Sequence, residues 1–261
     1  MIRYLRILRV CFLNSVQLEL EYRASFAIHA FDSLLGVGAG LAVIFALFEQ
    51  GAALGGWTFT EVLVLFGAFS IAQGVIDIVL LPSLGKVSEH IKQGSMDYML
   101  LKPVNLQFLV SVREWNLWGL PDLLLGFGIV LYGMEANGTL TAANLMLFVP
   151  LMLSGVVVFY SLTAVVTVTA FWSVQAGNAY FILYSLLGSG RYPVGVYPRW
   201  LRFIFIFVAP IAFVTTVPAS AAIGRLDGTM ALGSLLAAAI ALGLSALIWR
   251  LAARSYTSAS S

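Results

Sequence analysis

The stretch PSLGKVSEHIKQGSMDYMLLKPVN, which runs from Pro82 to Asn105, is a polar interruption between two long apolar stretches. Within it, Val87 to Gln93 has a helix-forming composition, and Gly94 is placed to end that helix. Val87 and Ile91 are four residues apart, so they share one helix face. A helix this short is not stable alone. The pattern therefore favours a docking element, with a solvated loop between two spans as the alternative.

The composition is that of a chain whose solvent is lipid. Hydrophobic residues make up 61% and charged residues 10% of the sequence, against roughly 45–50% and about 25% in soluble domains. The formal net charge is only +2, and no run of Lys or Arg occurs, so we expect no nucleic-acid partner. The length fits one membrane domain over residues 1–261, and the single Cys11 excludes an internal disulfide.

Residues 1–22 predict an interfacial amphipathic helix rather than a signal peptide. Apolar residues at helical spacing fall on one side, namely Leu5, Leu8, Phe12, Val16 and Leu20. Polar residues fall on the other side, namely Arg3, Arg6, Asn14, Gln17 and Glu21. Such a helix lies in the headgroup region, where its arginines face anionic lipid.

We predict an all-α integral membrane protein with six membrane-spanning helices, since about 20 apolar residues cross the hydrocarbon core. The predicted spans are Ala24–Phe48, Val62–Leu81, Leu106–Tyr132, Leu145–Ala170, Val174–Leu187 and Leu232–Trp249. Residues 191–225 are rich in Pro and aromatic residues, and Phe203–Val217 within them is short and contains Pro210. A re-entrant helical hairpin on the outer side, before the last span, is therefore favoured over a further crossing.

Lysine and arginine set the expected orientation, because they collect on the cytoplasmic side of membrane proteins. With six crossings both termini share one side. That side holds Arg3, Arg6, Arg9, Arg23, Lys86, Lys92, Lys102, Arg250 and Arg254. On the opposite side, cations occur only within residues 191–225. The termini and residues 82–105 are therefore predicted to be cytoplasmic.

Charged residues interrupt the predicted spans at Asp32, Asp77, Arg113, Glu114 and Asp122. A charge at the bilayer centre costs at least about 2.5–3.5 kcal/mol and usually faces protein or water. Pairing between helices is favoured over a proton or ion relay. Asp32 and Arg113 would lie at matching depths of about 10–12 Å, so we predict an ion pair between them. Asp77 and Glu114 are the alternative partners for Arg113.

Gly36 and Gly40 form a G-x-x-x-G face, where a helix of the same subunit or of a second copy can approach closely. No other motif points to catalysis. The chain has no G-x-x-x-x-G-K-[ST] phosphate loop, and Gly188-Ser189-Gly190 indicates a turn rather than a nucleophile elbow. His29 and His90 lie on opposite sides of the first two predicted spans, so no metal site is expected. We expect neither a catalytic residue nor a cofactor in this chain.

The order of these elements resembles the permease subunit of bacterial ABC exporters of the ABC-2 superfamily. That family has an amphipathic N-terminal helix, six spans, a cytoplasmic coupling helix between spans two and three, and short re-entrant helices before span six. The residues that carry the resemblance are Ile91-x-x-Gly94-x-x-Asp97-x-x-Leu100-Leu101-x-Pro103-Val104-Asn105, together with Tyr192-Pro193, Tyr197-Pro198, Pro210 and Pro218. They are similar to the branch described as ABC-2 family transporter proteins.

The resemblance implies that two permease subunits, identical or paralogous, form the pathway in a bacterial plasma (inner) membrane. Two separate ATPase subunits, which bind ATP and Mg²⁺, would dock beneath them. The ATPase-coupling residues would be Val87, Glu89, His90, Ile91, Lys92, Gln93, Gly94 and Asp97, with Ile91 as the main anchor. Trp172–Asn178 would form a smaller second contact.

The residues alone leave two other classes open. One is a stand-alone secondary transporter or channel, although no internal repeat is visible. The other is an intramembrane enzyme, although no convergent nucleophile, acid–base pair or metal set is visible. The substrate stays open, because an apolar drug, a lipid, a glycan and a peptide are all compatible with walls of Leu, Val, Phe and Ala.

Overall fold

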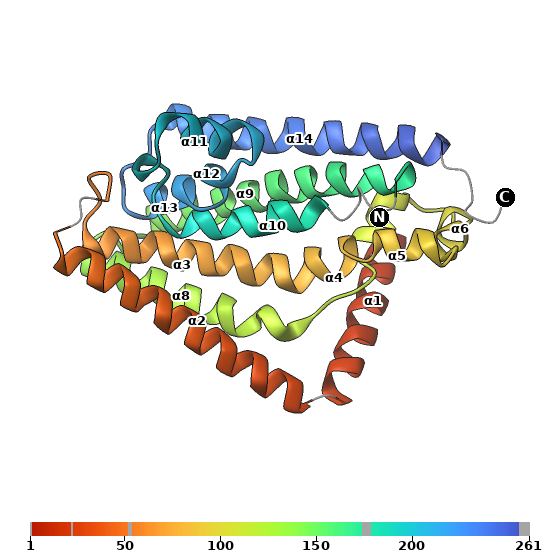
Figure 1. Cartoon of the computed structure of the whole chain (residues 1–261), viewed down its shortest axis with the longest axis horizontal. Helices are drawn as coiled ribbons and strands as arrows, with labels where there is room; N and C mark the ends of the chain where they lie inside the picture. The colour runs from red at the N-terminus through yellow and green to blue at the C-terminus, as the bar shows by residue number, and fades with distance from the viewer. Residues whose placement is uncertain (1, 22, 52–53, 174–178, 256–261) are drawn as a thin grey trace.

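The computed structural model describes residues 2–21, 23–51, 54–173 and 179–255, and in these ranges it consists of helices and short turns without a β-strand (Figure 1). The predicted all-α fold is confirmed. The longer helices are α1 (Ile2–Glu21), α2 (Arg23–Glu49), α3 (Phe59–Val75), α8 (Leu120–Ala136), α9 (Ala142–Val168), α10 (Tyr180–Leu187) and α14 (Gly228–Ser255). The shorter ones are α4 (Leu81–Leu84), α5 (Val87–Lys92), α6 (Ser95–Leu100), α7 (Leu106–Ser111), α11 (Arg199–Phe203), α12 (Ile211–Val214) and α13 (Thr216–Ala222).

Within the described residues, five helices are long and apolar enough to cross a membrane: Ala24–Glu49, Phe59–Lys92, Leu117–Ala136, Ala142–Phe171 and Gly228–Arg254. A bent pair, Arg199–Val208 and Ile211–Ala222, becomes a sixth if it is counted as one span, and its two arms differ in direction by 69°. The break falls at Pro210, which lacks a backbone N–H donor and cannot continue a helix without a kink. The bend covers the region where the hairpin is predicted.

One of the predicted spans is broken in the structure, and another is described only in part. The predicted third span starts at Leu106, but α7 ends at Ser111, and residues 112–116 are not helical before the chain turns into α8. Asn116 starts the new helical stretch, because its side chain accepts a hydrogen bond from the backbone N–H of Trp118. The predicted fifth span, Val174–Leu187, starts in residues that lie outside the described ranges. Its described part is α10, which lies beside α9 (Figure 1).

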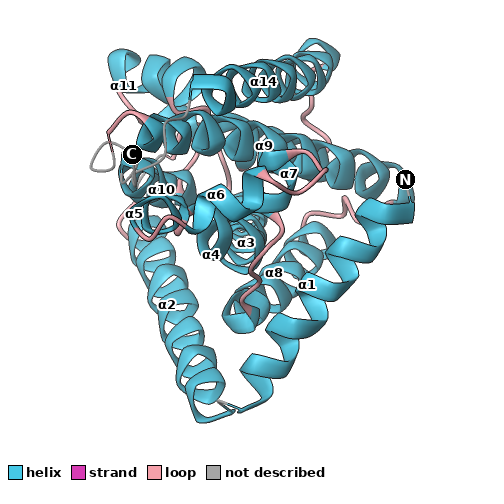
Figure 2. Cartoon of the chain, turned by 90° about the vertical axis from the view of Figure 1, so that its right-hand side faces the viewer, coloured by secondary structure: helices cyan, strands magenta, loops and turns pink. Residues whose placement is uncertain are grey.

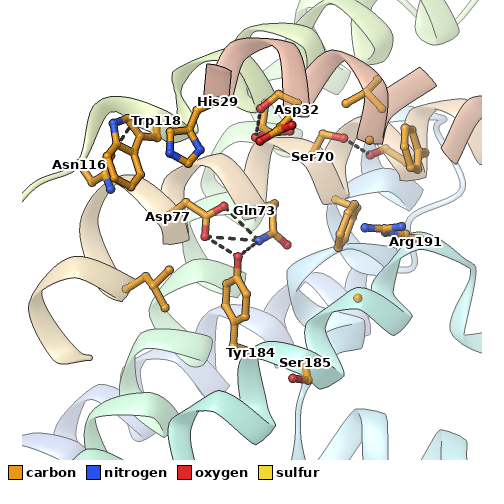
Figure 3. Close-up of a pocket in the computed structure, with 18 residues that line it drawn as sticks. His29, Asp32, Ser70, Gln73, Asp77, Asn116, Trp118, Tyr184, Ser185 and Arg191 are labelled. Carbon is orange, nitrogen blue, oxygen red and sulfur yellow. Dashed lines mark hydrogen bonds between the residues drawn. The ribbon is translucent and has the colours of Figure 1, made fainter. Parts of the chain in front are cut away.

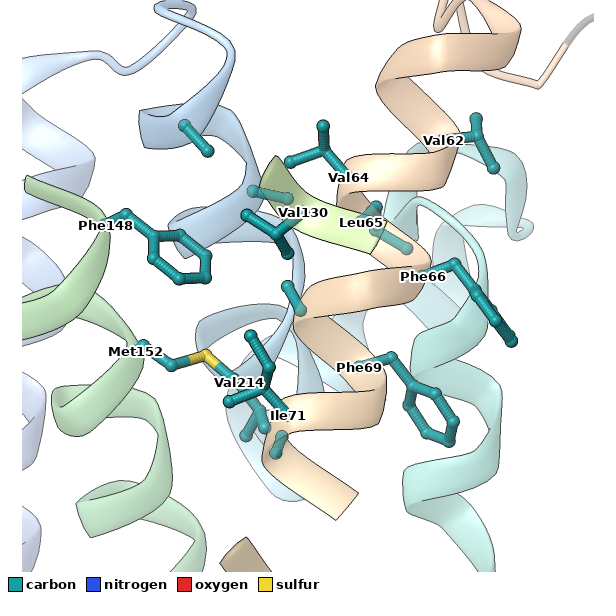
Figure 4. Packing of buried hydrophobic residues seen from close by; sticks show 14 of the residues in the cluster. Val62, Val64, Leu65, Phe66, Phe69, Ile71, Val130, Phe148, Met152 and Val214 are labelled. Atoms are coloured by element: carbon teal, nitrogen blue, oxygen red, sulfur yellow. The ribbon is translucent and has the colours of Figure 1, made fainter. Parts of the chain in front are cut away.

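The centre of the bundle is α3, most of whose residues between Glu61 and Gly74 are buried. Figure 4 shows Val64, Leu65 and Ile71 of α3 with Val130 of α8 and Val214 of α12, and Phe148 and Met152 of α9 belong to the same cluster. Because α3 has neighbours on all sides, its apolar residues show no single-sided pattern. The two outer helices, α2 and α14, expose most of their apolar surface instead.

Glycines allow α3 and α8 to pack backbone against backbone. A Cβ atom on Gly126 would lie 2.7 Å from the backbone nitrogen of Ile71 and 2.8 Å from the carbonyl oxygen of Gly67. Two turns further along α3, a Cβ on Gly74 would lie 2.7 Å from the carbonyl oxygen of Gly119. No side chain fits between backbones at that separation. Small residues at helix interfaces are the usual solution in membranes, where close packing drives association.

The helices α5, α6 and α7 form a cap at the end of the bundle where α1 begins and α14 ends (Figure 1). Figure 2 views this end directly, with α1 crossing it on one side. A second apolar cluster fixes the cap to the bundle, and it includes Met96 and Met99 of α6, Val168 of α9, and Trp249 of α14. The Nε1–H group of Trp249 also donates a hydrogen bond to the carbonyl oxygen of Ala164, at 2.9 Å.

Candidate functional site

A cavity of about 560 Å³ opens between α2, the C-terminal half of α3, α8 and α10. Figure 3 shows part of its polar lining: His29 and Asp32 from α2, Gln73 and Asp77 from α3 and its continuation, and Tyr184 from α10. Asp122 from α8 also lines the cavity. Aromatic rings of Phe66, Phe69 and Trp118 form part of the apolar wall. The cavity is thus assembled from four helices that come from both halves of the sequence.

Asp77 lies where the α-helix widens into one π-helical turn, η1 (Ile76–Leu80). Such turns are rare and occur often at functional sites. The Tyr184 hydroxyl donates a hydrogen bond to Asp77 Oδ1 at 2.7 Å, and Gln73 Nε2 donates to Oδ2 at 3.1 Å. Gln73 also donates to the Tyr184 oxygen. The carboxyl group of Asp77 is therefore held in one place by two side chains.

Asp122 joins α8 to α2, because Ser33 Oγ donates a hydrogen bond to its Oδ2 at 2.7 Å. A second link lies beside it, since the rings of His29 and Trp118 stack with centroids 3.9 Å apart and planes 15° apart. Together they fasten the otherwise exposed α2 to the start of α8. Asp32 is next to this contact and lines the cavity.

The opposite wall carries a cation. The guanidinium carbon of Arg191 lies 5.1 Å from the centroid of the Phe69 ring, which is a cation–π distance. Three carboxyl groups, one arginine and one histidine therefore share this lining, with aromatic rings between them. Among the described residues, no group of three or more His, Cys, Asp or Glu side chains is arranged to hold a metal ion.

The structure separates the five charged residues that the sequence places in spans. Asp32, Asp77 and Asp122 line one cavity, whereas Arg113 and Glu114 lie in the non-helical break between α7 and α8. The predicted ion pair between Asp32 and Arg113 is wrong: the ion pairs among the described residues include none between them. Arg113 is exposed in the break rather than buried inside a span.

Glu114 has partners on the cap instead of inside the bundle. It forms an ion pair with Lys86, and its Oε1 lies 3.9 Å from His90 Nε2. The hydroxyl of Ser83 donates to its carbonyl oxygen at 2.7 Å and accepts from its backbone N–H at 3.0 Å. These bonds attach the α4–α5 region to the break that leads into the cavity wall.

In the predicted coupling stretch, the apolar face points inward. Val87 and Ile91 are 0% and 4% exposed and pack against the second apolar cluster, so Ile91 is not available as a docking anchor and that prediction is wrong. Glu89, Lys92 and Gln93 are exposed, whereas His90, Gly94 and Asp97 are half-buried. Gly94 has φ +67° and makes the turn from α5 to α6, a conformation that glycine adopts without steric cost.

The exposed apolar side chains of the cap come from the next helix and the turn after it. Tyr98 is 73% and Leu101 is 81% exposed. In the predicted second contact, Trp172 is 64% exposed, while residues 174–178 lie outside the described ranges. The two glycines of the predicted G-x-x-x-G face differ: the three atoms nearest to a Cβ on Gly40 all belong to the Phe66 ring, whereas a Cβ on Gly36 has nothing within 4 Å.

The family model for ABC-2 family transporter proteins matches residues 34–260 of this chain. The chain belongs to the ABC-2 transporter family. It is therefore a membrane permease component of an ABC transporter, as the resemblance in the sequence implies. No curated protein and no solved structure matches this chain.

Sequence reasoning missed the glycines that shape this ABC-2 membrane domain. Gly67 and Gly74 are seven residues apart, as are Gly119, Gly126 and Gly133, and seven residues are close to two helical turns. That spacing was the available signal for a close helix contact. Tyr184 gave no such signal, because an aromatic residue in an apolar run is ordinary core in most helices.

Proposed function

We propose that this chain is the membrane-spanning half of an ATP-driven exporter and that it couples to separate ATPase subunits through α5 and α6 of the cap. The observation that carries this proposal is the exposure of Tyr98 and Leu101 at the end of the bundle, beside the charged Glu89 and Lys92. On a water-facing end, large apolar side chains flanked by charges are typical of a protein interface.

The energetics of such a contact are sufficient. Burying one large apolar side chain contributes about 1.5–3 kcal/mol, and buried aromatic anchors dominate many interfaces. Glu89 and Lys92 would lie at the rim, where ion pairs contribute less and depend on salt. The proposed contact thus uses the stretch expected from the sequence, but with Tyr98 of α6 and Leu101 of the turn after it as anchors in place of Ile91.

A continuous set of contacts supports the cap as a coupling element. Its inward face packs on α9 and α14 through Met96, Met99 and Trp249, so the cap is tightly held to the spans. Lys86 and Ser83 bind Glu114, and only two residues further along the chain Asn116 lines the cavity. We propose that movement of the cap on ATP binding reaches the cavity wall along this route.

In the complete transporter, two copies of this chain, or this chain and a paralogue, would form the pathway in a bacterial plasma membrane with their termini in the cytoplasm. The cavity between α2, α3, α8 and α10 is the part of the pathway that this chain would provide. ATP and Mg²⁺ would be bound by the ATPase subunits, in keeping with the lack of a phosphate-loop motif in this sequence.

The test is to express the chain with and without the ABC ATPase encoded beside it and to reconstitute both preparations in lipid nanodiscs. We expect the two proteins to copurify at equal stoichiometry and ATP hydrolysis to depend on the permease. A secondary transporter or channel would instead move its substrate down an ion gradient without the ATPase. Permease that purifies alone, while the ATPase is active and soluble in the same cells, contradicts the proposal.

A further inference from the structure

A second cavity, of about 360 Å³, lies between α1 and residues 102–109. We call it the basic cleft. Its cations are Arg3 and Arg6 of α1 and Lys102 of the opposite wall. None of these three cations forms an ion pair with another residue that the structure describes, and no acidic residue is among its lining residues.

The rest of the lining is apolar. Ile7 and Val10 come from α1, while Val104 and Leu109 come from the opposite wall. The two walls are held together at one end by Tyr4, whose ring meets Phe108 edge-on at 4.9 Å and whose hydroxyl accepts a hydrogen bond from the backbone N–H of Asn105 at 3.4 Å. The cleft therefore combines a cationic part with an apolar part within one defined space.

A ligand that satisfies both parts must carry an anion and a hydrocarbon chain. Inorganic phosphate satisfies only the cations, and a neutral lipid satisfies only the apolar walls. The cleft lies on α1, the helix expected at the membrane interface. There, Lys and Arg side chains each contribute to the attraction of anionic headgroups.

We propose that the basic cleft binds one anionic phospholipid, with its phosphate group between Arg3, Arg6 and Lys102 and its acyl chains along Ile7 and Leu109. The bound lipid would bridge α1 to residues 102–109, which lead from α6 into α7 of the cap. This proposal goes beyond the proposed coupling to an ATPase and does not depend on it, because it concerns the permease alone.

Cys11 provides a reporter, since it is the only cysteine in the sequence and lines the cleft, half-buried. Burial raises the pKa of its thiol, while Lys102 and Arg113 act in the opposite direction. Removal of Lys102 therefore changes the labelling rate even without lipid. Each variant must be compared with itself, with and without the anionic lipid.

The experiment measures the rate of maleimide labelling of Cys11 in nanodiscs of phosphatidylcholine alone and of phosphatidylcholine with phosphatidylglycerol. Native mass spectrometry counts the phosphatidylglycerol retained by the purified chain. We expect phosphatidylglycerol to slow the labelling and one such lipid to be retained. Lys102→Gln should lower the lipid affinity about fivefold, and the triple variant Arg3→Gln, Arg6→Gln, Lys102→Gln should lose protection.

The matched control is Arg9→Gln, which removes the same charge from the same helix at a residue outside the cleft lining. It should keep the protection. Circular dichroism and size-exclusion chromatography establish that the triple variant is folded, and Lys102→Gln alone serves if it is not. The proposal is overturned if Arg9→Gln and Lys102→Gln reduce protection equally, which indicates general surface charge. It is also overturned if inorganic phosphate protects Cys11 as well as phosphatidylglycerol does.

Discussion

Tyr184 of α10 donates a hydrogen bond to Asp77, 107 residues earlier in the chain, with 2.7 Å between the hydroxyl oxygen and Oδ1. Gln73, one turn before Asp77, donates to the same carboxyl group. The bond joins α10 to the π-helical turn that interrupts the continuation of α3. A polar group inside a membrane domain is costly without a partner, so this contact fixes both the position of the acid and the packing of α10.

We predict that Tyr184→Phe lowers the free energy of unfolding by about 1–3 kcal/mol, because it leaves Asp77 with one donor fewer in a partly buried site. Thermal unfolding in nanodiscs measures this. The control is Tyr180→Phe, one turn earlier on the same helix, since the Tyr180 hydroxyl has no hydrogen bond to a residue that the structure describes. Equal effects of the two variants would contradict the role given to the Tyr184–Asp77 bond.

The contact between α3 and α8 predicts a sharp difference between two glycines of one helix. Gly126→Ala places a Cβ within 2.8 Å of the Gly67 carbonyl oxygen, so the helices must separate, at a cost of about 1–3 kcal/mol. Gly128→Ala meets nothing within 4 Å and should be neutral or stabilise by up to about 1 kcal/mol through helix propensity. Differential scanning fluorimetry of the two variants in the same detergent makes the comparison.

The sequence predicted the long apolar helices well, because their length and composition alone set them apart. It failed where a partner had to be chosen. The spacing of Val87 and Ile91 predicts that one face of α5 is buried, but it does not predict which residues bury it. In the structure that face belongs to an apolar cluster with Trp249 and Val168 of the same chain. The depth match of Asp32 with Arg113 failed because it assumed an unbroken helix from Leu106.

The candidate cavity was accessible from sequence only in part. Asp32, Asp77 and Asp122 are conspicuous, since acids are rare in apolar spans. Their meeting in one cavity depends on the close approach of α3 and α8, which the glycines allow, and on the Ser33–Asp122 hydrogen bond that holds α2 to α8. The break at residues 112–116 that removes Arg113 and Glu114 from the bundle carries no Gly or Pro, so its one local signal is Asn116, the residue that caps the helical stretch after it.

The two ends of the bundle should lie on opposite sides of the membrane. In a Cys11→Ser background, Leu101→Cys reports the cap, and Thr229→Cys reports the start of α14 at the other end. Both native residues are exposed. In intact cells a membrane-impermeant maleimide should label Thr229→Cys, and it should reach Leu101→Cys only after permeabilisation. Labelling of both residues in intact cells would contradict the proposed orientation.

The buried and exposed faces of the cap lead to opposite outcomes for two substitutions of the same kind. Ile91→Asp places a carboxylate in the second apolar cluster, where even truncation of an isoleucine costs about 2–5 kcal/mol, so we expect little folded permease. Leu101→Asp changes a side chain that is 81% exposed, so the permease should fold with an unchanged melting temperature. If Leu101 docks into the ATPase, its loss should weaken the complex about tenfold or more, since about 1.5–3 kcal/mol of burial is removed.

The matched control for this prediction is Leu140→Asp, which puts the same acid in place of an exposed leucine in the turn between α8 and α9. Copurification of the ATPase and permease-dependent ATP hydrolysis are measured for all three variants. Leu140→Asp should retain the partner at full stoichiometry, because its turn lies at the far end of the bundle from the cap. Full retention by Leu101→Asp as well would mean that the exposed end of α6 is only a solvated turn and that the ATPase docks elsewhere.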